Sequence, residues 1–462
     1  MKSLVLAEKP SVARDIARVL GCHKNISGAI EGSNYIVTWA LGHLVTLADP
    51  EEYDKKFKAW DMSYLPMVPK KWELVVIKQT SKQYHNVKTQ LFRKDVSEII
   101  IATDAGREGE LVARWILDKS GCHKPIRRLW ISSVTDKAIK EGFAHLKDGR
   151  AYNDLYHAAR SRAEADWLVG INATRALTCK YNAQLSCGRV QTPTLAMIAH
   201  REDQIRSFKP EDYYGLRCTT SVTGGSAGTT ASIVTWTWQQ KKSGSLRSFN
   251  KDLITGLDKK LKNQTLTVTD VHTSSKRTPS PGLYDLTELQ RDANKRFGFS
   301  AKETLNIMQS LYEHHKVLTY PRTDSRYIGT DIVPTIKERL KACNIGLYKK
   351  YIPELLKKPL KTSKAFVDDK KVSDHHAIIP TEEYVQMEHM SNNERKIYDL
   401  VVRRFISVLY PALEYEQTTR RAEAAGETFT AKGKVIKAAG WKAVYSDAAS
   451  SGSSASQYDT YG

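Results

Sequence analysis

The chain has 462 residues, which is more than one hydrophobic core usually serves, since cores stop growing at roughly 250–300 residues. It carries 71 Lys and Arg against 51 Asp and Glu, a formal net charge of +20 that favours nucleic acid as partner, with acidic lipid as the alternative. No apolar run approaches the ~20 residues that cross a bilayer, and no signal-peptide pattern opens the chain, so we expect a cytoplasmic protein without a membrane partner.

Residues 1–150 alternate short apolar runs with amphipathic segments, which predicts an α/β domain around a mainly parallel sheet. A helix is expected to begin at Pro10 and to end at Gly21, and a cap for a later helix is expected at Ser133 or Thr135. Strands of this domain are expected at residues 3–7, 35–40, 99–102 and 128–132.

The composition then changes several times along the chain. Residues 151–212 are rich in Ala, Leu and Arg and predict a helical domain, whereas 213–278 are rich in Thr, Ser, Val and Trp and predict a β-rich domain. Helical spacing returns over 279–410, and strand-like sequence over 411–445 is expected to pair with the earlier β-rich region. Residues 446–462 are rich in Ser, Ala and Gly without Lys or Arg, which predicts a disordered or aberrant tail.

Two local patterns refine this organisation. Ser300 with Glu303 predicts a capping box at the start of a helix. The strands of the β-rich parts are expected at residues 229–238, 265–271, 413–419, 427–432 and 441–445. The six cysteines are scattered without a CxxC pair, which argues against a zinc ribbon and against a disulfide framework.

Acidic residues follow two of the expected strands. Glu8 comes after the first strand, and the segment DAGREGE at 104–110 follows the strand at 99–102. Because the carboxyl ends of parallel strands meet at one crevice, Glu8, Asp104 and Glu108 can converge there. Three carboxylates form an oxygen cage suited to Mg²⁺. The alternative is that each acid stabilises the N-terminus of a helix.

This arrangement resembles the Toprim domain that topoisomerases and primases share. Many members of that family have Asp where this chain has Gly106, so one candidate ligand is absent here. The resemblance therefore implies a single Mg²⁺ ion on Glu8 and Asp104, with Glu108 nearby.

Residues 318–325, LTYPRTDS, place a tyrosine before a proline and an arginine. A tyrosine hydroxyl has a pKa of about 10, so it becomes a useful nucleophile only where cations and a proton acceptor favour the phenolate. Arg322 can reach the phosphate that Tyr320 attacks and neutralise its developing charge. The string TYPRTDS resembles the nucleophile motif of type IA DNA topoisomerases.

A third motif, SCGRVQTP at 186–193, follows a helical segment that contains Trp167. Arg and Gln beside a tight Gly suit hydrogen bonds to phosphates and base edges, and Trp167 offers a face for base stacking, although periodicity alone favours the core for this residue. The segment GRVQTP resembles the single-strand binding helix of the same family. The DNA contacts that follow are Gly188, Arg189, Val190, Gln191, Thr192, Pro193, Arg175, Trp167, Trp60 and Arg322.

A fourth motif, DHHAIIPT at 374–381, contains paired histidines before an apolar turn. Such histidines can contact a phosphate or relay a proton. In the type IA family a histidine at the first of these positions lies near the scissile phosphate, and the resemblance assigns that place to His375.

Four motifs in the family's order identify the chain as a member of the type IA DNA topoisomerases, in the topoisomerase III group. The resemblance implies a multidomain torus that combines the α/β, helical and β-rich parts. It also implies that Tyr320 forms a 5′-phosphotyrosine link, that Arg322 and Lys9 stabilise the transition state, and that Lys9 or Glu8 gives a proton to the departing 3′ oxygen. The domains implied are a Toprim domain (1–150), a helical single-strand domain (151–212), a β-rich arch (213–278 and 411–445) and the domain of the tyrosine (279–410).

The covalent link conserves the bond energy, so no ATP is required, and no P-loop signature is present. The resemblance implies relaxation of negative supercoils and separation of linked circles, with single-stranded DNA and a helicase as partners, and a monomer. Family members continue with a long segment after residues like 440–445, where this chain has its Ser-rich tail. One alternative is therefore a truncated protein that binds or cleaves single-stranded DNA without strand passage, and another is a Toprim phosphodiesterase.

Overall fold

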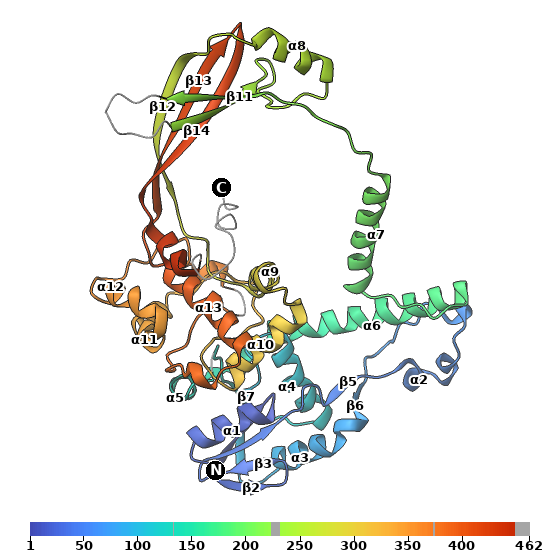
Figure 1. Cartoon of the computed structure of the whole chain (residues 1–462). Helices are drawn as coiled ribbons and strands as arrows, with labels where there is room; N and C mark the ends of the chain where they lie inside the picture. Colours follow the sequence, from blue (N-terminus) through green and yellow to red (C-terminus); the bar gives the residue numbers. More distant parts are fainter. Residues whose placement is uncertain (133, 223–231, 373–374, 449–462) are drawn as a thin grey trace. The chain divides into compact units, whose positions relative to one another are not determined.

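The computed structural model describes residues 1–132, 134–222, 232–372 and 375–448 (Figure 1). The chain divides into two compact units. Unit 1 consists of Met1–Ala199 and Gly282–Leu409, and unit 2 consists of His200–Pro281 and Tyr410–Gly462. No helix in the described ranges is long and apolar enough to cross a bilayer.

Unit 1 contains a seven-stranded sheet with the order β2-β3-β4-β1-β7-β8-β9. The parallel strands at its centre are β4 (Tyr35–Trp39), β1 (Lys2–Ala7), β7 (Val96–Ala102) and β8 (Ile126–Arg128). The antiparallel strands at its edges are β2 (Lys24–Ile26), β3 (Ala29–Glu31) and β9 (Lys147–Asp148). The predicted parallel sheet is therefore confirmed, although β8 ends at Arg128, where the predicted strand begins.

Helices cover both faces of this sheet because consecutive residues of β1, which point to opposite faces, are apolar. Val5 packs with α1 and α5 on one face, and Leu6 packs with α3, α4 and α6 on the other. The helices are α1 (Pro10–Val19), α3 (Ser81–Leu91), α4 (Arg107–Ser120), α5 (Asp136–Ala144) and α6 (Asn153–Tyr181). Pro10 opens α1 as predicted, and the Thr135 side chain accepts a hydrogen bond from Ala138 N to cap α5, whereas Ser133 lies outside the described residues.

The helix α6 belongs to the same core as the sheet. Trp167 is only 9% exposed, its indole N–H donates to Ala48 O at 2.9 Å, and its ring packs edge-on against Tyr53 and Trp72. The predicted role of Trp167 as a stacking face for DNA is therefore wrong, because these contacts bury the ring. Residues 151–199 also do not form a compact unit of their own.

The remaining part of unit 1 is mainly helical. The Ser300 side chain accepts from Glu303 N at 3.1 Å where α10 begins, and Arg404 of α13 forms a buried ion pair with Asp292 of α9 at 3.0 Å. The helices here are α9 (Leu286–Phe297), α10 (Ala301–Glu313), α11 (Ile336–Ala342), α12 (Ile352–Leu356) and α13 (Asn392–Ser407). Shorter elements of unit 1 are β5 (Val45–Leu47), α2 (Pro50–Tyr53) and β6 (Leu74–Val76). A further helix, α7 (Gln191–Ser207), runs from unit 1 into unit 2.

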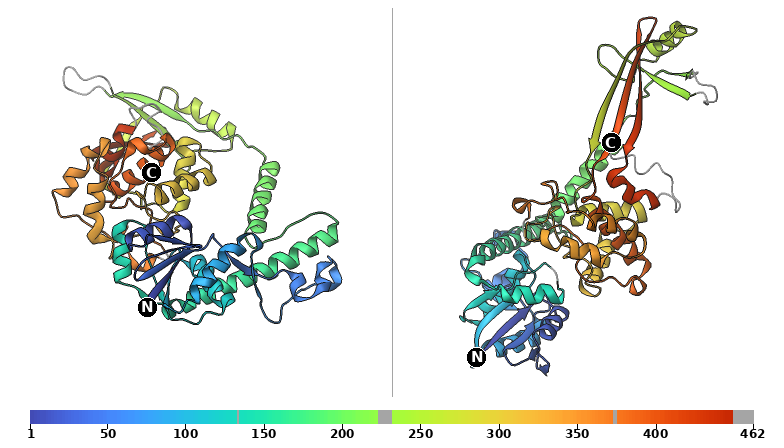
Figure 2. Two further views of the ribbon diagram at one scale, coloured as in Figure 1. Left: turned by 90° about the horizontal axis from the view of Figure 1, so that it is seen from below. Right: turned by 90° about the vertical axis from the view of Figure 1, so that its left-hand side faces the viewer.

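Unit 2 is built on a five-stranded antiparallel sheet with the order β10-β11-β14-β13-β12, whose long strands are seen from two sides in Figure 2. The pairing of the late strands β13 and β14 with the earlier β12 and β11 confirms the prediction for 411–445. Its elements are β10 (Arg217–Val222), β11 (Ser232–Gln239), α8 (Lys251–Leu261), β12 (Thr267–Thr278), β13 (Leu413–Ala424) and β14 (Glu427–Ala438).

The strand predicted at 441–445 is wrong. These residues lie in a 3₁₀ helix, Gly440–Ala448. Gly440 adopts a left-handed conformation with φ of 52°, and the Trp441 indole donates to Thr278 O at 3.0 Å, so the chain turns back onto the end of β12. Of the predicted tail, residues 449–462 lie outside the described residues, as do 229–231 of the strand predicted at 229–238.

We expect Trp167→Ala to lower the free energy of unfolding of unit 1 by about 3–5 kcal/mol, because it removes a large buried side chain and leaves a cavity. A urea denaturation curve followed by circular dichroism measures this loss. Val169→Ala on the same helix is the matched control, since Val169 is 44% exposed. Equal midpoints for the two variants would contradict the buried position of Trp167.

Candidate active site

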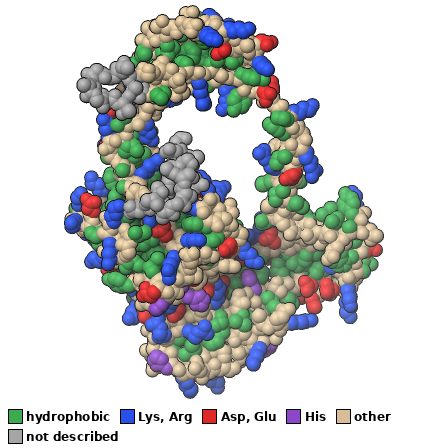
Figure 3. Space-filling model, viewed as in Figure 1, with side chains coloured by type: hydrophobic (Ala, Val, Ile, Leu, Met, Phe, Trp, Pro, Cys, Tyr) green, Lys and Arg blue, Asp and Glu red, His purple; other side chains and the backbone are tan. Residues whose placement is uncertain are grey.

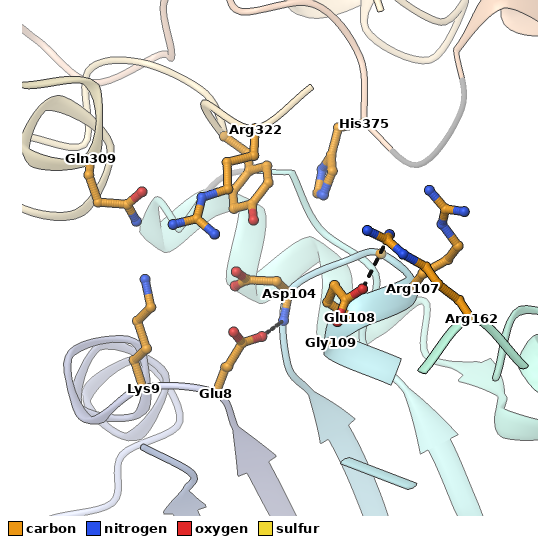
Figure 4. Close-up of a pocket in the computed structure, with 12 residues that line it drawn as sticks. Glu8, Lys9, Asp104, Arg107, Glu108, Gly109, Arg162, Gln309, Arg322 and His375 are labelled. Atoms are coloured by element: carbon orange, nitrogen blue, oxygen red, sulfur yellow. Dashed lines mark hydrogen bonds and ion pairs between the residues drawn. The ribbon is translucent and has the colours of Figure 1, made fainter. Parts of the chain in front are cut away.

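A cavity of about 230 Å³ in unit 1 opens at the carboxyl ends of β1 and β7 (Figure 4). The first part of the chain supplies Glu8, Lys9, Asp104, Gly106, Arg107, Glu108, Gly109 and Arg162. The later part supplies Gln309, Tyr320, Arg322 and His375. The residues that the sequence predicted for catalysis and metal binding thus lie around one space, although more than 300 positions separate Glu8 from Tyr320.

Glu8 and Asp104 lie side by side in this cavity. The Asp104 backbone N–H donates to Glu8 Oε2 at 3.1 Å. Burial, followed by the negative charge of Asp104, raises the pKa of Glu8 to about 7. Burial also raises the pKa of Asp104, against the lowering effect of the Lys9 charge and of a hydrogen bond from Tyr320. The pair therefore favours binding of a proton or a cation.

Glu108 does not join the pair. Its side chain is 61% exposed, and its Oε1 lies 3.5 Å from Arg162 Nη1. Across the described residues, no group of three or more His, Cys, Asp and Glu side chains is arranged to hold a metal ion. The predicted cage of three carboxylates is therefore wrong for this structure. Glu8 and Asp104 still suit Mg²⁺, which commonly takes one or two carboxylates and completes its shell with water and phosphate oxygens.

The loop that carries Asp104 is fixed by Arg128, a residue that sequence reasoning missed. The Arg128 side chain is fully buried, and its Nε donates to Glu110 Oε2 at 3.0 Å. Its Nη1 donates to Thr103 O at 2.8 Å and its Nη2 to Asp104 O at 2.7 Å. A buried guanidinium requires such partners. The sequence signal for this network was Glu110, the last acid of DAGREGE. Its carboxylate pairs with Arg128 and does not line the cavity.

The first turn of α4 lies against the same loop because residue 109 is glycine. A Cβ atom at Gly109 would come within 2.1 Å of Asp104 O, and Thr103 Oγ1 donates to Gly109 O at 2.7 Å. A side chain at this position would push the loop away from α4. The glycine therefore contributes to the position of the Asp104 carboxylate.

Tyr320 reaches the cavity from a segment tied to two others. Its backbone N–H donates to Ser132 O at 3.2 Å, and Thr319 N donates to Ile379 O at 3.0 Å. The Tyr320 ring stacks on His375 with centroids 4.1 Å apart and meets Tyr312 edge-on at 5.5 Å. These contacts hold the ring while its hydroxyl projects toward the carboxylates.

The Tyr320 hydroxyl donates a hydrogen bond to Asp104. Burial, followed by the charge of Asp104, raises the pKa of Tyr320 well above its usual range, while the charge of Arg322 lowers it. The hydroxyl is therefore protonated in this structure. The proton acceptor expected from the sequence is present, but the positive charge does not outweigh burial and the two carboxylates.

Two cationic side chains line the cavity beside the tyrosine. Arg322 is exposed, whereas Lys9 forms an ion pair with Glu313 of α10, with Nζ and Oε1 2.6 Å apart. Gln309 also donates to the Glu313 carboxylate. Sequence reasoning missed Glu313. Figure 4 shows Lys9, Gln309 and Arg322 on the side of the cavity that faces Asp104.

The two neighbouring histidines have different surroundings. Burial lowers the pKa of both side chains to about 4, so both are neutral near pH 7. His376 Nε2 lies 3.1 Å from Ser132 Oγ, and its Nδ1 lies 2.7 Å from Ala377 O. The buried Nδ1 of His375, by contrast, has no hydrogen-bond partner among the described residues. Of the two histidines, His375 lines this cavity and His376 does not, while Asp374 of the motif lies outside the described residues.

The predicted DNA-binding segment at 188–193 is exposed where α7 begins. Arg189 pairs with Asp166 of α6, and Gly188 N donates to Thr192 Oγ1 at 3.0 Å. The Gln191 amide contacts Ser186 Oγ at 3.4 Å. Val190 is 67% exposed, and Pro193 lies exposed in the first turn of α7. The side chains predicted to contact DNA here are accessible.

Arg175 is only 6% exposed, so its predicted role as a DNA contact is wrong. Its guanidinium donates to Phe57 O and lies 5.1 Å from the centroid of the Trp60 ring. These contacts position Trp60, which is 52% exposed. Of the two tryptophans predicted to contact DNA, Trp60 is therefore the one with an accessible ring, while Trp167 is buried.

The chain is similar to known proteins over most of its length. Residues 3–134 match the sequence model of the Toprim domain, and residues 150–459 match that of a DNA topoisomerase family. DNA topoisomerase 3 of Bacillus cereus is 64% identical over 444 residues, which cover 96% of this chain and 59% of that protein. DNA topoisomerase 3 of Bacillus subtilis is 60% identical over 444 residues, covering 96% of this chain and 60% of that protein. The chain thus spans about three-fifths of the length of these relatives.

A solved structure gives the same result for the fold. Full-length topoisomerase I from Thermotoga maritima aligns with a TM-score of 0.67 at 23% identity, over 96% of this chain and 67% of that chain. At this level of identity the likeness concerns the fold alone. The two family matches, together with relatives at 60–64% identity, show that the chain belongs to the type IA DNA topoisomerases and carries a Toprim domain at its N-terminal end.

Proposed function

We propose that this chain is an ATP-independent type IA DNA topoisomerase. Tyr320 attacks a phosphodiester of single-stranded DNA, forms a 5′-phosphotyrosine link and leaves a free 3′ hydroxyl. Another strand then passes through the break before religation, which relaxes negative supercoils and separates linked circles. The observation that carries this proposal is the Tyr320 hydroxyl, hydrogen-bonded to Asp104 in a cavity that also contains Lys9 and Arg322.

The cavity supplies groups for both proton transfers. Asp104 already accepts the hydrogen bond of the Tyr320 hydroxyl, so it takes the proton as the tyrosine oxygen bonds to phosphorus. Glu8, with a pKa raised to about 7, gives a proton to the departing 3′ oxygen. Lys9, whose ammonium is paired with Glu313 in this structure, is the alternative donor.

Positive charge near the phosphate lowers the barrier, because catalysis of phosphoryl transfer is mainly positioning and electrostatic stabilisation. Arg322 lies two residues from the nucleophile and lines the same cavity. Lys9 changes partner from Glu313 to the phosphate when DNA binds. Neutral His375, stacked on the Tyr320 ring, lines the same cavity and contacts a phosphate oxygen there.

Glu8 and Asp104 are the residues that would hold one Mg²⁺ ion, together with phosphate oxygens. When bound, the ion supplies positive charge that offsets the two carboxylates and the DNA phosphates during religation. A single ion is proposed because Gly106 offers no side-chain ligand and Glu108 faces Arg162.

Single-stranded DNA is the proposed substrate. Arg189 and Gln191 are exposed for phosphates and base edges, and the Trp60 ring provides a stacking face. We further propose a monomer that acts on the nucleoid in the cytoplasm, with a helicase as a partner that opens the duplex for it.

Tyr320→Phe removes the nucleophilic oxygen but leaves the ring that stacks on His375. We expect the covalent adduct with a single-stranded oligonucleotide to fall on the order of 10⁴-fold or more, assayed after denaturation with detergent. Tyr312→Phe is the matched control, because its ring lies beside Tyr320 and the variant should keep the adduct. A normal adduct yield in Tyr320→Phe would rule out the proposed nucleophile.

The role of Glu8 as proton donor predicts a pH dependence. Below about pH 7 its carboxyl is protonated, and above that pH the donor is lost. With divalent cations chelated, the rate of oligonucleotide cleavage should therefore fall about tenfold per pH unit above this range. Glu8→Gln should cleave more slowly and lack this decline. A wild-type rate that stays level as the pH rises would exclude Glu8 and assign the proton to Lys9.

The proposed magnesium site predicts different effects for two acidic residues. Asp104→Asn should weaken Mg²⁺ binding at least about tenfold in isothermal titration calorimetry, because one charged ligand is lost. Glu108→Gln is the control and should retain the wild-type affinity, since Glu108 is exposed and faces Arg162. Equal losses in the two variants would restore the cage of three carboxylates.

A further inference from the structure

The sheet of unit 2 has two chemically different faces. On one face Trp236, Trp238 and Phe429 are buried in a core completed by Ile254 and Leu257 of α8. Successive residues of a strand point to opposite sides, so the residues between these belong to the other face. That second face carries threonine, glutamine and basic side chains around a cavity of about 690 Å³.

The strand pairing places these polar residues in rows. Arg217 of β10 pairs with Thr237 of β11, and Thr237 pairs with Thr430 of β14. Thr430 in turn pairs with Arg421 of β13, so an arginine lies on each side of the two threonines, and Asp270 of β12 ends the row beside Arg421. In the same cavity Lys432 of β14 pairs with Thr419 of β13.

The basic residues of this face are not neutralised by ion pairs among the described residues, although Asp270 is the cross-strand neighbour of Arg421. Within the described ranges, Arg217, Arg421 and Lys432 make no ion pair with any carboxylate. Glu423 of β13, two residues from Arg421, lies 3.7 Å from Lys241 instead. Figure 3 shows many further Lys and Arg side chains over the molecule. Three unpaired cations between hydroxyl and amide groups repel one another until an anion with several charges binds.

We propose that this basic sheet face, formed by Arg217, Thr237, Thr419, Arg421, Thr430 and Lys432, binds the sugar-phosphate backbone of a second, double-stranded DNA segment. The inference rests on the proposed function and adds a DNA site to it that is separate from the strand cleaved by Tyr320. Phosphate contacts by Arg, Lys and Thr hold a duplex without reading its sequence.

Two observations favour a duplex over a single strand. Neighbouring strands lie about 4.8 Å apart, so the Cα atoms of Arg217 and Arg421 are roughly 14 Å apart, close to the ≈ 12 Å width of the major groove. The two side chains can therefore reach phosphates of both strands. The described residues that line the cavity also include no aromatic ring, whereas sites for single strands use such rings to stack bases.

The test compares two triple variants of the full chain that remove the same charge. R217Q/R421Q/K432Q alters the basic sheet face, and K251Q/K259Q/K262Q alters exposed lysines on and after α8, which packs against the opposite face. Affinity for a blunt, unnicked DNA duplex is measured over a range of salt concentrations. Each phosphate contact contributes about 0.9 to the slope of log affinity against log salt, so the first variant should lose roughly 2.7 from that slope.

The first variant should also bind the duplex at least about tenfold more weakly than the control variant at low salt. The variant R217K/R421K, which keeps the charge, should bind with the wild-type affinity. Adduct formation with a single-stranded oligonucleotide should be unchanged in both variants, which separates this inference from the nucleophilic role of Tyr320. An unchanged slope, an equal loss in the control variant, or a loss of single-strand binding that matches the loss for the duplex would each overturn the proposal.

Discussion

The closeness of two carboxylates, Glu8 and Asp104, determines the chemistry of the cavity in unit 1. Burial raises the pKa of both groups, and the charge of Asp104 raises that of Glu8 further, so Glu8 favours a proton and the pair favours a cation. The same charges keep the Tyr320 hydroxyl protonated while Asp104 accepts its hydrogen bond. A phosphate and a cation that enter together would change this balance, and the nucleophile would then be activated only when DNA is present.

The fold brings the two carboxylates together and fixes the loop that carries Asp104. The parallel strands β1 and β7 bring the two acids to one edge of the sheet. Arg128, fully buried, donates to the backbone carbonyls of Thr103 and Asp104 in the adjoining loop and to the carboxylate of Glu110 in α4. The Arg128 network, which does not line the cavity, thus supports the position of the Asp104 loop from beneath the site.

Much of this arrangement follows from local sequence. The strands of the parallel sheet and the cap at Thr135 were predictable because hydrophobic periodicity and capping depend on residues close in sequence. The convergence of Glu8 with Asp104 was predictable because the carboxyl ends of parallel strands meet at one edge of a sheet. The late strands were also correctly paired with the earlier β-rich region.

The errors concern residues whose role depends on distant partners. Helical periodicity favoured the core for Trp167, and its contacts with Ala48, Tyr53 and Trp72 show that it is buried, whereas Trp60 is exposed. The DNA contact predicted for Arg175 is wrong because its guanidinium donates to the carbonyl of Phe57, which its sequence context does not reveal. Glu108 was placed with the other acids because its neighbour Arg162 lies on another helix. Such choices are made by tertiary contacts that no short window of sequence contains.

In the proposed reaction the Tyr320 oxygen becomes bonded to a DNA phosphate. Mass spectrometry of peptides from protein trapped on a single-stranded oligonucleotide measures this bond directly. We expect a nucleotide joined through its 5′ phosphate to the peptide that contains Tyr320, with a free 3′ hydroxyl on the released fragment. A nucleotide on any other residue, or cleaved DNA without a protein-linked nucleotide, would contradict it.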